Sequence, residues 1–259
     1  MNPSDYTKWM DRAFLFVEGT LLRRAAEESP TRITEDFVRG ALIDGLKASK
    51  SEHANDVVME KDVPWNTSHD INNPAKAFGK GRARQHDVAF ETAGGTHLVC
   101  EAKWLKTKDP SAILADLWKL ALTHSVDDRE KNCCRTFLLV GGLKKPFQDT
   151  LTELRGHKVP LRWSPQGKAN GWPRPSNIDF GSLYSQTSGY NSLVGVLKRG
   201  ENYHRQPPPI WWKLRCSTVA RSWKTIRGHE WKIVLWELDY KASCGFYQVD
   251  WSDLKARLP

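Results

Sequence analysis

The sequence predicts an α/β protein in which a mixed β-sheet is flanked by helices. Segments with helical spacing of apolar residues alternate along the chain with short segments of strand-like alternation. One later segment is almost wholly apolar, as in a strand covered on both faces. The 259 residues, 39% of them apolar, suffice for one large domain or two small ones. No run of 18 apolar residues is present, so we expect no membrane span.

Two helices are predicted at the start of the chain. Apolar residues recur at helical spacing over residues 4–27, and Ser29-Pro30 ends that pattern. Thr31 or Thr34 then begins a second helix, with the sequence TEDFVRGALIDGLKAS. We expect residues 1–31 to form an N-terminal helix that precedes a core domain of residues 32–145.

Three strands are predicted to follow, over residues 56–63, 86–91 and 96–105. Ala93-Gly94-Gly95 between the last two fits a three-residue hairpin loop, in which Gly supplies the left-handed position. In this register Thr92 pairs with Thr96.

A helix and a fourth strand complete the predicted core. Asp109 caps a helix whose first residue is Pro110, and residues 133–142 form the nearly continuous apolar strand. The element order is therefore αβββαβ. A crossover through a helix makes the third and fourth strands parallel, so we expect a mixed sheet.

The remaining region, residues 146–259, is basic and rich in Trp. Residues 151–259 hold 17 Lys and Arg against 8 Asp and Glu, whereas residues 1–150 hold 22 of each kind. This region also carries 8 of the 12 Trp. Such a composition suits a polyanion with stackable bases, but buried Trp beneath a solvated basic face would look the same, and we favour a core position for the Trp.

The region is interpreted as an extension of the core or as a substrate-binding subdomain. A helix over residues 143–156 and strands over residues 210–219 and 230–240 are predicted within it. The segment 164–210 is rich in Pro, Gly, Ser and Asn, and we expect it to be a long functional loop or a linker.

The cysteines and the N-terminus indicate a cytoplasmic protein. The five Cys residues have the spacing of neither a disulfide framework nor paired zinc knuckles, so we expect reduced thiols. The first residues, MNPSDYTKWMDR, lack the pattern of a signal peptide.

Charged residues converge on one face of the predicted hairpin. Counting back from the turn with period two places Asp87 opposite Glu101, with Lys103 on the same face. Two adjacent carboxylates repel each other unless a cation joins them. Lys103 alone could form a structural ion triad with them, or the carboxylates could bind Mg²⁺ or Mn²⁺, which prefer such oxygens.

Asp87, followed by Glu101-Ala102-Lys103 on the next strand, resembles the PD-(D/E)xK nuclease superfamily, whose fold is restriction-endonuclease-like. The resemblance covers about residues 32–142 and includes the αβββαβ order. The leading Pro of the motif is replaced by His86, so only the Asp matches.

The resemblance implies a set of metal ligands and a catalytic lysine. Asp87, Glu101 and the carbonyl of Ala102 would bind Mg²⁺ or Mn²⁺, and Lys103 would act on the nucleophilic water. The superfamily often adds a Glu from the first core helix, for which Glu35 fits best. An acidic residue in the first helical turn is also favoured for electrostatic reasons alone.

Several further residues are weaker candidates. Lys80, Arg82 and Arg84 could grip phosphates or could form a solvated basic loop. Lys119, on the crossover helix, is a candidate for nucleic-acid contact because the superfamily often places Gln or Lys there. We interpret His86 as a core histidine that faces Val88.

These observations predict a metal-dependent nuclease that hydrolyses DNA phosphodiester bonds, of the prokaryotic restriction or phage-defence type by resemblance. Cleavage of both strands needs two sites, so we expect a homodimer or a partner protein. The alternatives are a catalytically inactive nucleic-acid-binding or assembly subunit with the same fold, an RNA-specific or structure-specific nuclease, and an unrelated α/β protein with a structural ion triad.

Overall fold

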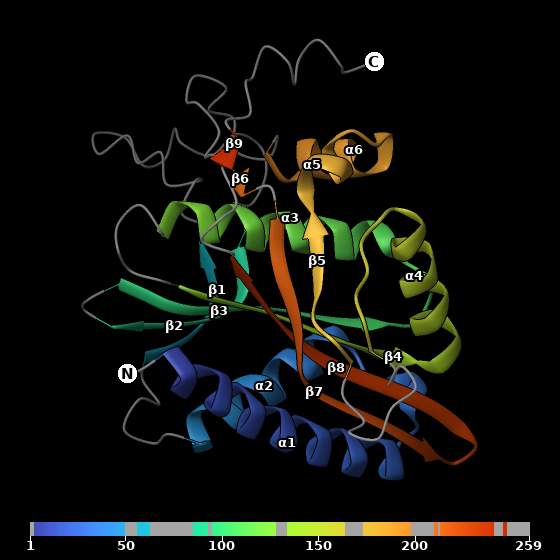
Figure 1. The fold of residues 1–259 in the computed structure, drawn as a ribbon. Helices are drawn as coiled ribbons and strands as arrows, with labels where there is room; N and C mark the ends of the chain where they lie inside the picture. Colours follow the sequence, from blue (N-terminus) through green and yellow to red (C-terminus); the bar gives the residue numbers. More distant parts are fainter. Residues whose placement is uncertain are drawn as a thin grey trace, which may run out of the picture.

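The structure, a computed structural model, is an α/β arrangement of one large mixed sheet between two layers of helices (Figure 1). It describes residues 3–49, 56–62, 85–92, 95–127, 134–163, 173–197, 210–211, 213–240 and 246–247. The helices are α1 (Pro3–Glu27), η1 (Pro30–Arg32), α2 (Glu35–Ser49), α3 (Pro110–Asp127), α4 (Lys144–Gly156), α5 (Phe180–Tyr184) and α6 (Thr187–Leu197). The strands are β1 (Val57–Asp62), β2 (Gln85–Thr92), β3 (Gly95–Leu105), β4 (Arg135–Leu143), β5 (Ser176–Asp179), β6 (Ile210–Trp211), β7 (Lys213–Ile226), β8 (His229–Tyr240) and β9 (Phe246–Tyr247).

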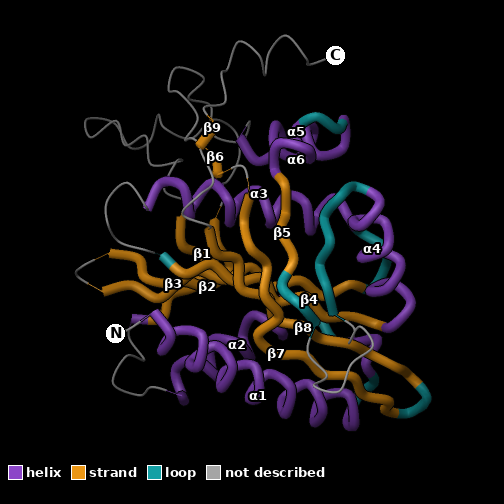
Figure 2. Tube along the Cα trace, viewed as in Figure 1, coloured by secondary structure: helices purple, strands orange, loops and turns teal. Residues whose placement is uncertain are grey.

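The large sheet has seven strands in the order β1-β2-β3-β4-β8-β7-β5. β3 and β4 are parallel, while the other neighbouring strands are antiparallel. The mixed sheet and its parallel third and fourth strands confirm the sequence prediction. The alternation of helices and strands along the chain is visible in Figure 2.

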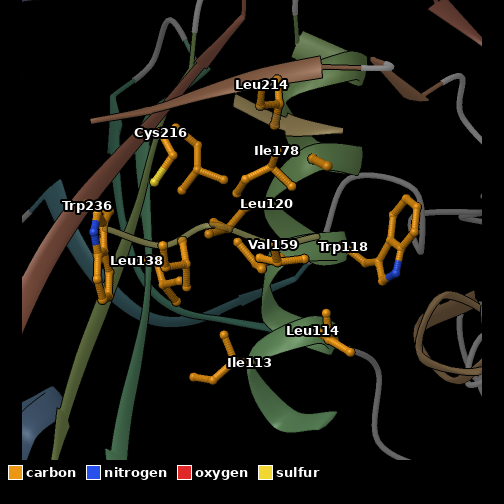
Figure 3. Close-up of a cluster of buried hydrophobic side chains, with 14 of the residues drawn as sticks. Ile113, Leu114, Trp118, Leu120, Leu138, Val159, Ile178, Leu214, Cys216 and Trp236 are labelled. Atoms are coloured by element: carbon orange, nitrogen blue, oxygen red, sulfur yellow. The ribbon is translucent and has the colours of Figure 1, made fainter. Parts of the chain in front are cut away.

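Each face of the sheet has its own hydrophobic core. Side chains of α1 and α2 pack on one face, where Trp9 of α1 contacts Phe90 of β2 edge to face. Side chains of α3, α4, α5 and α6 pack on the other face, and Figure 3 shows part of that cluster around α3. The C-terminal part of β3 therefore lies between α2 on one face of the sheet and α3 on the other.

The predicted helix starts are confirmed in their capping. Thr34 precedes α2, and its Oγ1 accepts a hydrogen bond from the backbone N–H of Phe37 at 3.2 Å. The Asp109 side chain accepts one from the N–H of Ala112 at 3.0 Å, with Pro110 as the first residue of α3.

The hairpin between β2 and β3 differs from the predicted one. Thr92 pairs with Gly95 and not with Thr96, and a register shift follows between Phe90 and Glu91. Beyond that bulge, Val88 pairs with Cys100, which is the register predicted from the longer loop. The predicted turn was one residue too long, but the bulge shifts the register by one residue, so the predicted pairing holds again before the strands reach Asp87.

The prediction of a loop or linker over residues 164–210 was wrong for its middle part. β5, α5 and α6 lie there, with β5 paired to β7, and the Trp118 indole N–H donates to the carbonyl of Gly189 at 2.9 Å. These elements have only 4, 5 and 11 residues, so each is too short to show a clear period in the sequence, although their apolar side chains are buried in the core. Residues 164–172 and 198–209 lie outside the described ranges.

The C-terminal region adds strands to the same sheet. β8 pairs with β4 from Thr136↔Leu238 to Leu143↔Trp231, and β7 pairs with β8. Trp231 and Trp236 are fully buried, as expected of core residues. Within the described residues, no helix is both long and apolar enough to cross a membrane.

Candidate functional site

The site begins where β2 and β3 separate. Their ladder ends at the pair Val88↔Cys100, although both strands continue beyond it. The Asp87 side chain occupies the resulting fork, where its Oδ2 accepts a hydrogen bond from the backbone N–H of Ala102 at 2.8 Å. Asp87 thus satisfies a strand N–H that the ladder no longer pairs.

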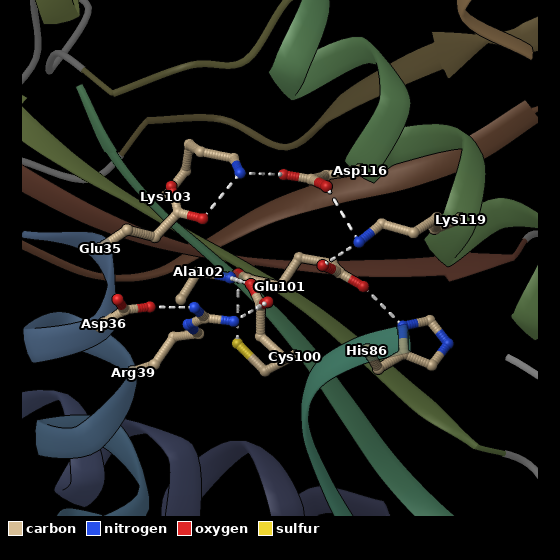
Figure 4. Close-up of polar contacts among 11 residues, drawn as sticks. Glu35, Asp36, Arg39, His86, Cys100, Glu101, Ala102, Lys103, Asp116 and Lys119 are labelled. Carbon is tan, nitrogen blue, oxygen red and sulfur yellow. Dashed lines mark hydrogen bonds and ion pairs between the residues drawn. The ribbon is translucent and has the colours of Figure 1, made fainter. Parts of the chain in front are cut away.

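Glu101, on β3, is fully buried and bonded at both carboxylate oxygens. His86 Nδ1 lies 2.6 Å from its Oε1, and the Lys119 ammonium contacts its Oε2 (Figure 4). His86 Nε2 in turn lies 2.7 Å from the Thr123 hydroxyl. Two residues of α3 therefore hold Glu101, one directly and one through His86.

Lys103 links the two helical layers. Its Nζ donates to Glu35 Oε1 on α2 at 2.9 Å and lies 3.6 Å from Asp116 Oδ2 on α3. Asp116 also pairs with Lys119, at 3.1 Å. The helices on opposite faces of the sheet thus meet at the end of β3 through one lysine (Figure 4).

Arg39 completes the cluster on the α2 side. Its Nη1 donates to Asp87 Oδ1 at 3.0 Å, and its Nη2 contacts Asp36. Because Arg39 follows Glu35 by four residues, both lie on one face of α2. We call this set the fork cluster: Glu35, Asp36, Arg39, His86, Asp87, Glu101, Lys103, Asp116 and Lys119.

Burial raises the pKa values of the two strand carboxyls, Asp87 and Glu101. Burial, with Glu101 nearby, raises the pKa of Asp87 to about 6. Burial and the Lys119 charge lower the pKa of His86 to about 3, so its ring is neutral. When Glu101 is ionised, the neutral His86 ring carries its proton on Nδ1, and this N–H donates a hydrogen bond to Glu101.

Both lysines remain charged. Burial alone would lower the pKa of Lys103, but Asp116 and Glu35 outweigh it and raise the pKa. The pKa of Lys119 is raised by Asp116 and Glu101 against the same effect of burial. In this arrangement Lys103 can neutralise negative charge and orient a water, and it is not a proton acceptor.

The structure brings most of the predicted site residues together. Asp87, Glu101 and Lys103 lie at the fork, Ala102 lies between the last two, and Glu35 reaches Lys103 from α2. Lys80, Arg82 and Arg84 lie outside the described residues.

Two predicted positions differ. Lys119 is buried on Glu101 and Asp116, so it does not lie where a phosphate could reach it in this state. His86 is buried, as predicted for a core histidine, but its ring bonds Glu101 and Thr123 in place of the apolar surroundings expected beside Val88. Beyond Val88, β2 no longer pairs with β3 but stays paired with β1 through Gln85, and the His86 ring reaches Thr123 of α3.

Arg39 and Asp116 were not among the residues that the sequence predicted for the site. A signal for Arg39 existed, since it stands four residues after Glu35. Asp116 and Lys119 are likewise three residues apart on α3. Only the fold reveals that these two helical pairs face the same strand end.

The donor chemistry of the cluster fits a hard divalent cation. Its acidic side chains offer carboxylate oxygens, the ligands that Mg²⁺ and Mn²⁺ prefer, and the buried Asp116 Oδ2 has no hydrogen-bond partner. Over the described ranges, however, no three acidic, His or Cys side chains stand in a group ready to hold a metal. Hydrogen bonds and ion pairs within the protein already occupy the carboxylate oxygens of Asp87 and Glu101.

Comparisons with protein families, with curated proteins and with solved structures found no match.

Proposed function

We propose that this protein is a metal-dependent nuclease that hydrolyses DNA phosphodiester bonds. One observation carries the proposal. Asp87 and Glu101, from two neighbouring strands, stand beside Lys103 at a fork where helices of both layers meet. Burying so many charges without a function is costly, and perturbed pKa values in such a cluster are typical of functional sites.

The residues take the roles that the PD-(D/E)xK resemblance implies. Asp87, Glu101 and the carbonyl of Ala102 would hold Mg²⁺ or Mn²⁺, with Glu35 close by on Lys103. A bound cation lowers the pKa of its water and stabilises charge on the phosphate. Lys103 orients that water and neutralises the phosphate, because its ammonium stays protonated between Glu35 and Asp116.

The substrate and the assembly follow from charge and from the reaction. The 17 Lys and Arg in residues 151–259, against 8 acidic residues, favour a polyanionic partner. Cleavage of a duplex on both strands needs two such sites, so a homodimer or a partner protein would supply the second. A role in prokaryotic restriction or phage defence is part of the proposal, as is a cytoplasmic location.

The deciding experiment is cleavage of supercoiled plasmid with Mg²⁺ or Mn²⁺, with EDTA as the blank. Wild type is expected to nick or linearise the plasmid, and Lys103→Ala is expected to lose at least about 100-fold in rate while its thermal unfolding stays cooperative. Equal cleavage by wild type and the variant would contradict the assigned site. A panel of duplex DNA, single-stranded DNA, branched DNA and RNA at one salt concentration identifies the substrate.

A second candidate function is favoured by one feature of the site. Both oxygens of Glu101 and both oxygens of Asp87 are already bonded within the protein. A nucleic-acid-binding or assembly subunit without activity would keep such a closed cluster. It would bind DNA with the same affinity in EDTA and in Mg²⁺, and it would not cleave any member of the panel.

A further inference from the structure

We propose that Lys119 is the resident counter-ion of Glu101, and that a divalent cation binds the fork by exchanging with it. The inference rests on the proposed metal-dependent function and adds a positioning residue that controls cation affinity. It assigns Lys119 to the cation site, in place of the contact with nucleic acid that the sequence suggested.

Both carboxylate oxygens of Glu101 already have partners within the protein. Its side chain is fully buried, with His86 Nδ1 at 2.6 Å from Oε1 and the Lys119 ammonium on Oε2. The neutral His86 ring supplies a hydrogen bond but no positive charge. Lys119 therefore balances the charge of Glu101, and a cation that binds Glu101 must take its place.

Lys119 has a second carboxylate partner, Asp116, to which it can remain bound when it leaves Glu101. Its Nζ lies 3.1 Å from Asp116 Oδ1, three residues earlier on α3. The other oxygen, Asp116 Oδ2, is buried without a hydrogen-bond partner and lies 3.6 Å from Lys103. A displaced ammonium can stay on the Asp116 carboxylate, so exchange does not leave an unpaired buried charge, which would be costly.

Lys119 and Arg39 are not equivalent. Arg39 occupies Asp87, but its side chain is 22% exposed and it also holds the exposed Asp36. The Lys119 side chain is 8% exposed and Glu101 is 0% exposed. Release of Arg39 is thus a surface rearrangement, whereas release of Lys119 requires a replacement charge inside the protein.

The test is thermal unfolding of the full chain with and without Mg²⁺, at pH 8.5, for wild type and Lys119→Met. Met matches the unbranched stem of Lys and removes the charge. Without Mg²⁺ the variant is expected to melt below wild type, because Glu101 loses its counter-ion. With Mg²⁺ it is expected to rise further than wild type does, corresponding to at least about tenfold tighter binding. Lys108→Met, on an exposed pair with Glu153, is the matched control and is expected to follow wild type.

Failure of the exchange and failure of the metal-dependent function give different results in this experiment. A Mg²⁺-induced rise in Lys119→Met that is equal to or smaller than that of wild type overturns the exchange, while a clear rise in wild type keeps the metal-dependent function. No rise in either protein overturns both. Should Lys119→Met not fold, Asp116→Asn decides, because it removes the carboxylate that receives the displaced ammonium. That variant is expected to bind Mg²⁺ more weakly than wild type, and unchanged affinity contradicts the proposal.

Discussion

Two clusters of charged side chains lie on the same sheet, one on its α1 face and one at the fork of β2 and β3, where helices of both faces meet. On the α1 face, Glu237 of β8 pairs with Arg135 of β4 and accepts a hydrogen bond from Thr7 of α1. The only other acid that pairs there with Arg135, within the described residues, is Asp239, which is 3.9 Å away and 42% exposed. At the fork of β2 and β3, the fork cluster brings five carboxylates to three cations drawn from the sheet, from α2 on one face and from α3 on the other.

The difference separates a structural ion pair from a candidate site. In the first cluster one arginine meets one buried carboxylate, and a helix hydroxyl completes the contacts, which ties α1 to the sheet. Burial raises the pKa of the carboxyl in both clusters, but only in the fork cluster is the neighbouring strand carboxyl that raises it further, Glu101 beside Asp87, itself fully buried. Two neighbouring carboxyls repel each other when both are ionised, and a divalent cation would remove that repulsion.

The largest expected effect comes from neutralising one buried carboxylate in each cluster. Glu101→Gln is expected to lower plasmid cleavage by about 1000-fold or more, because the proposed cation ligand is lost. Glu237→Gln is expected to leave cleavage within about threefold and to lower the free energy of unfolding by about 1–3 kcal/mol. Cleavage rates and urea unfolding of both variants check this, and equal losses of cleavage would erase the distinction between the clusters.

A second expected effect concerns pH and the neutral His86. Its pKa is about 3 in the folded protein against 6.5 as the ordinary value, so the unfolded chain alone gains a proton as pH falls below 6.5. The stability that His86 contributes is complete above pH 6.5 and is lost progressively toward pH 3. By pH 5 this loss is about 2 kcal/mol.

His86→Asn keeps a donor for Glu101 and removes the titration. Urea unfolding at pH 7 and pH 5 is expected to show the larger fall in stability for wild type, since the two carboxyls shift in the opposite direction in both proteins. A fall of the same size in the variant would mean that His86 is not held neutral by the fork cluster.

The sequence predicted the position of Asp87 because two deviations from the predicted hairpin offset each other. Asp87 was placed opposite Glu101 from a three-residue loop, whereas Thr92 pairs with Gly95 and a bulge restores the register. The alternation rule then failed at His86, which pairs with Lys61 of β1 but no longer with β3. The contacts that join α2 and α3 at the strand end depend on tertiary packing, which no local pattern encodes, so Arg39 and Asp116 were missed.

The smallest expected effect distinguishes Glu35 from its neighbour. Glu35 and Asp36 both lie in the first turn of α2, where acidic residues contribute similarly to helix stability. Glu35 bonds Lys103, whereas the Asp36 side chain is 81% exposed. Glu35→Gln is therefore expected to lower cleavage about tenfold and Asp36→Asn by less than about twofold, with similar small costs in stability. Identical cleavage rates would reduce Glu35 to a helix-start residue.

The most direct measurement is anomalous diffraction from crystals of the protein soaked in Mn²⁺. We expect one peak in contact with carboxylate oxygens of both Asp87 and Glu101, with the Lys119 ammonium moved off Glu101 and onto Asp116. A fork without Mn²⁺, or Mn²⁺ bound only at surface carboxylates while Lys119 stays on Glu101, would contradict this expectation.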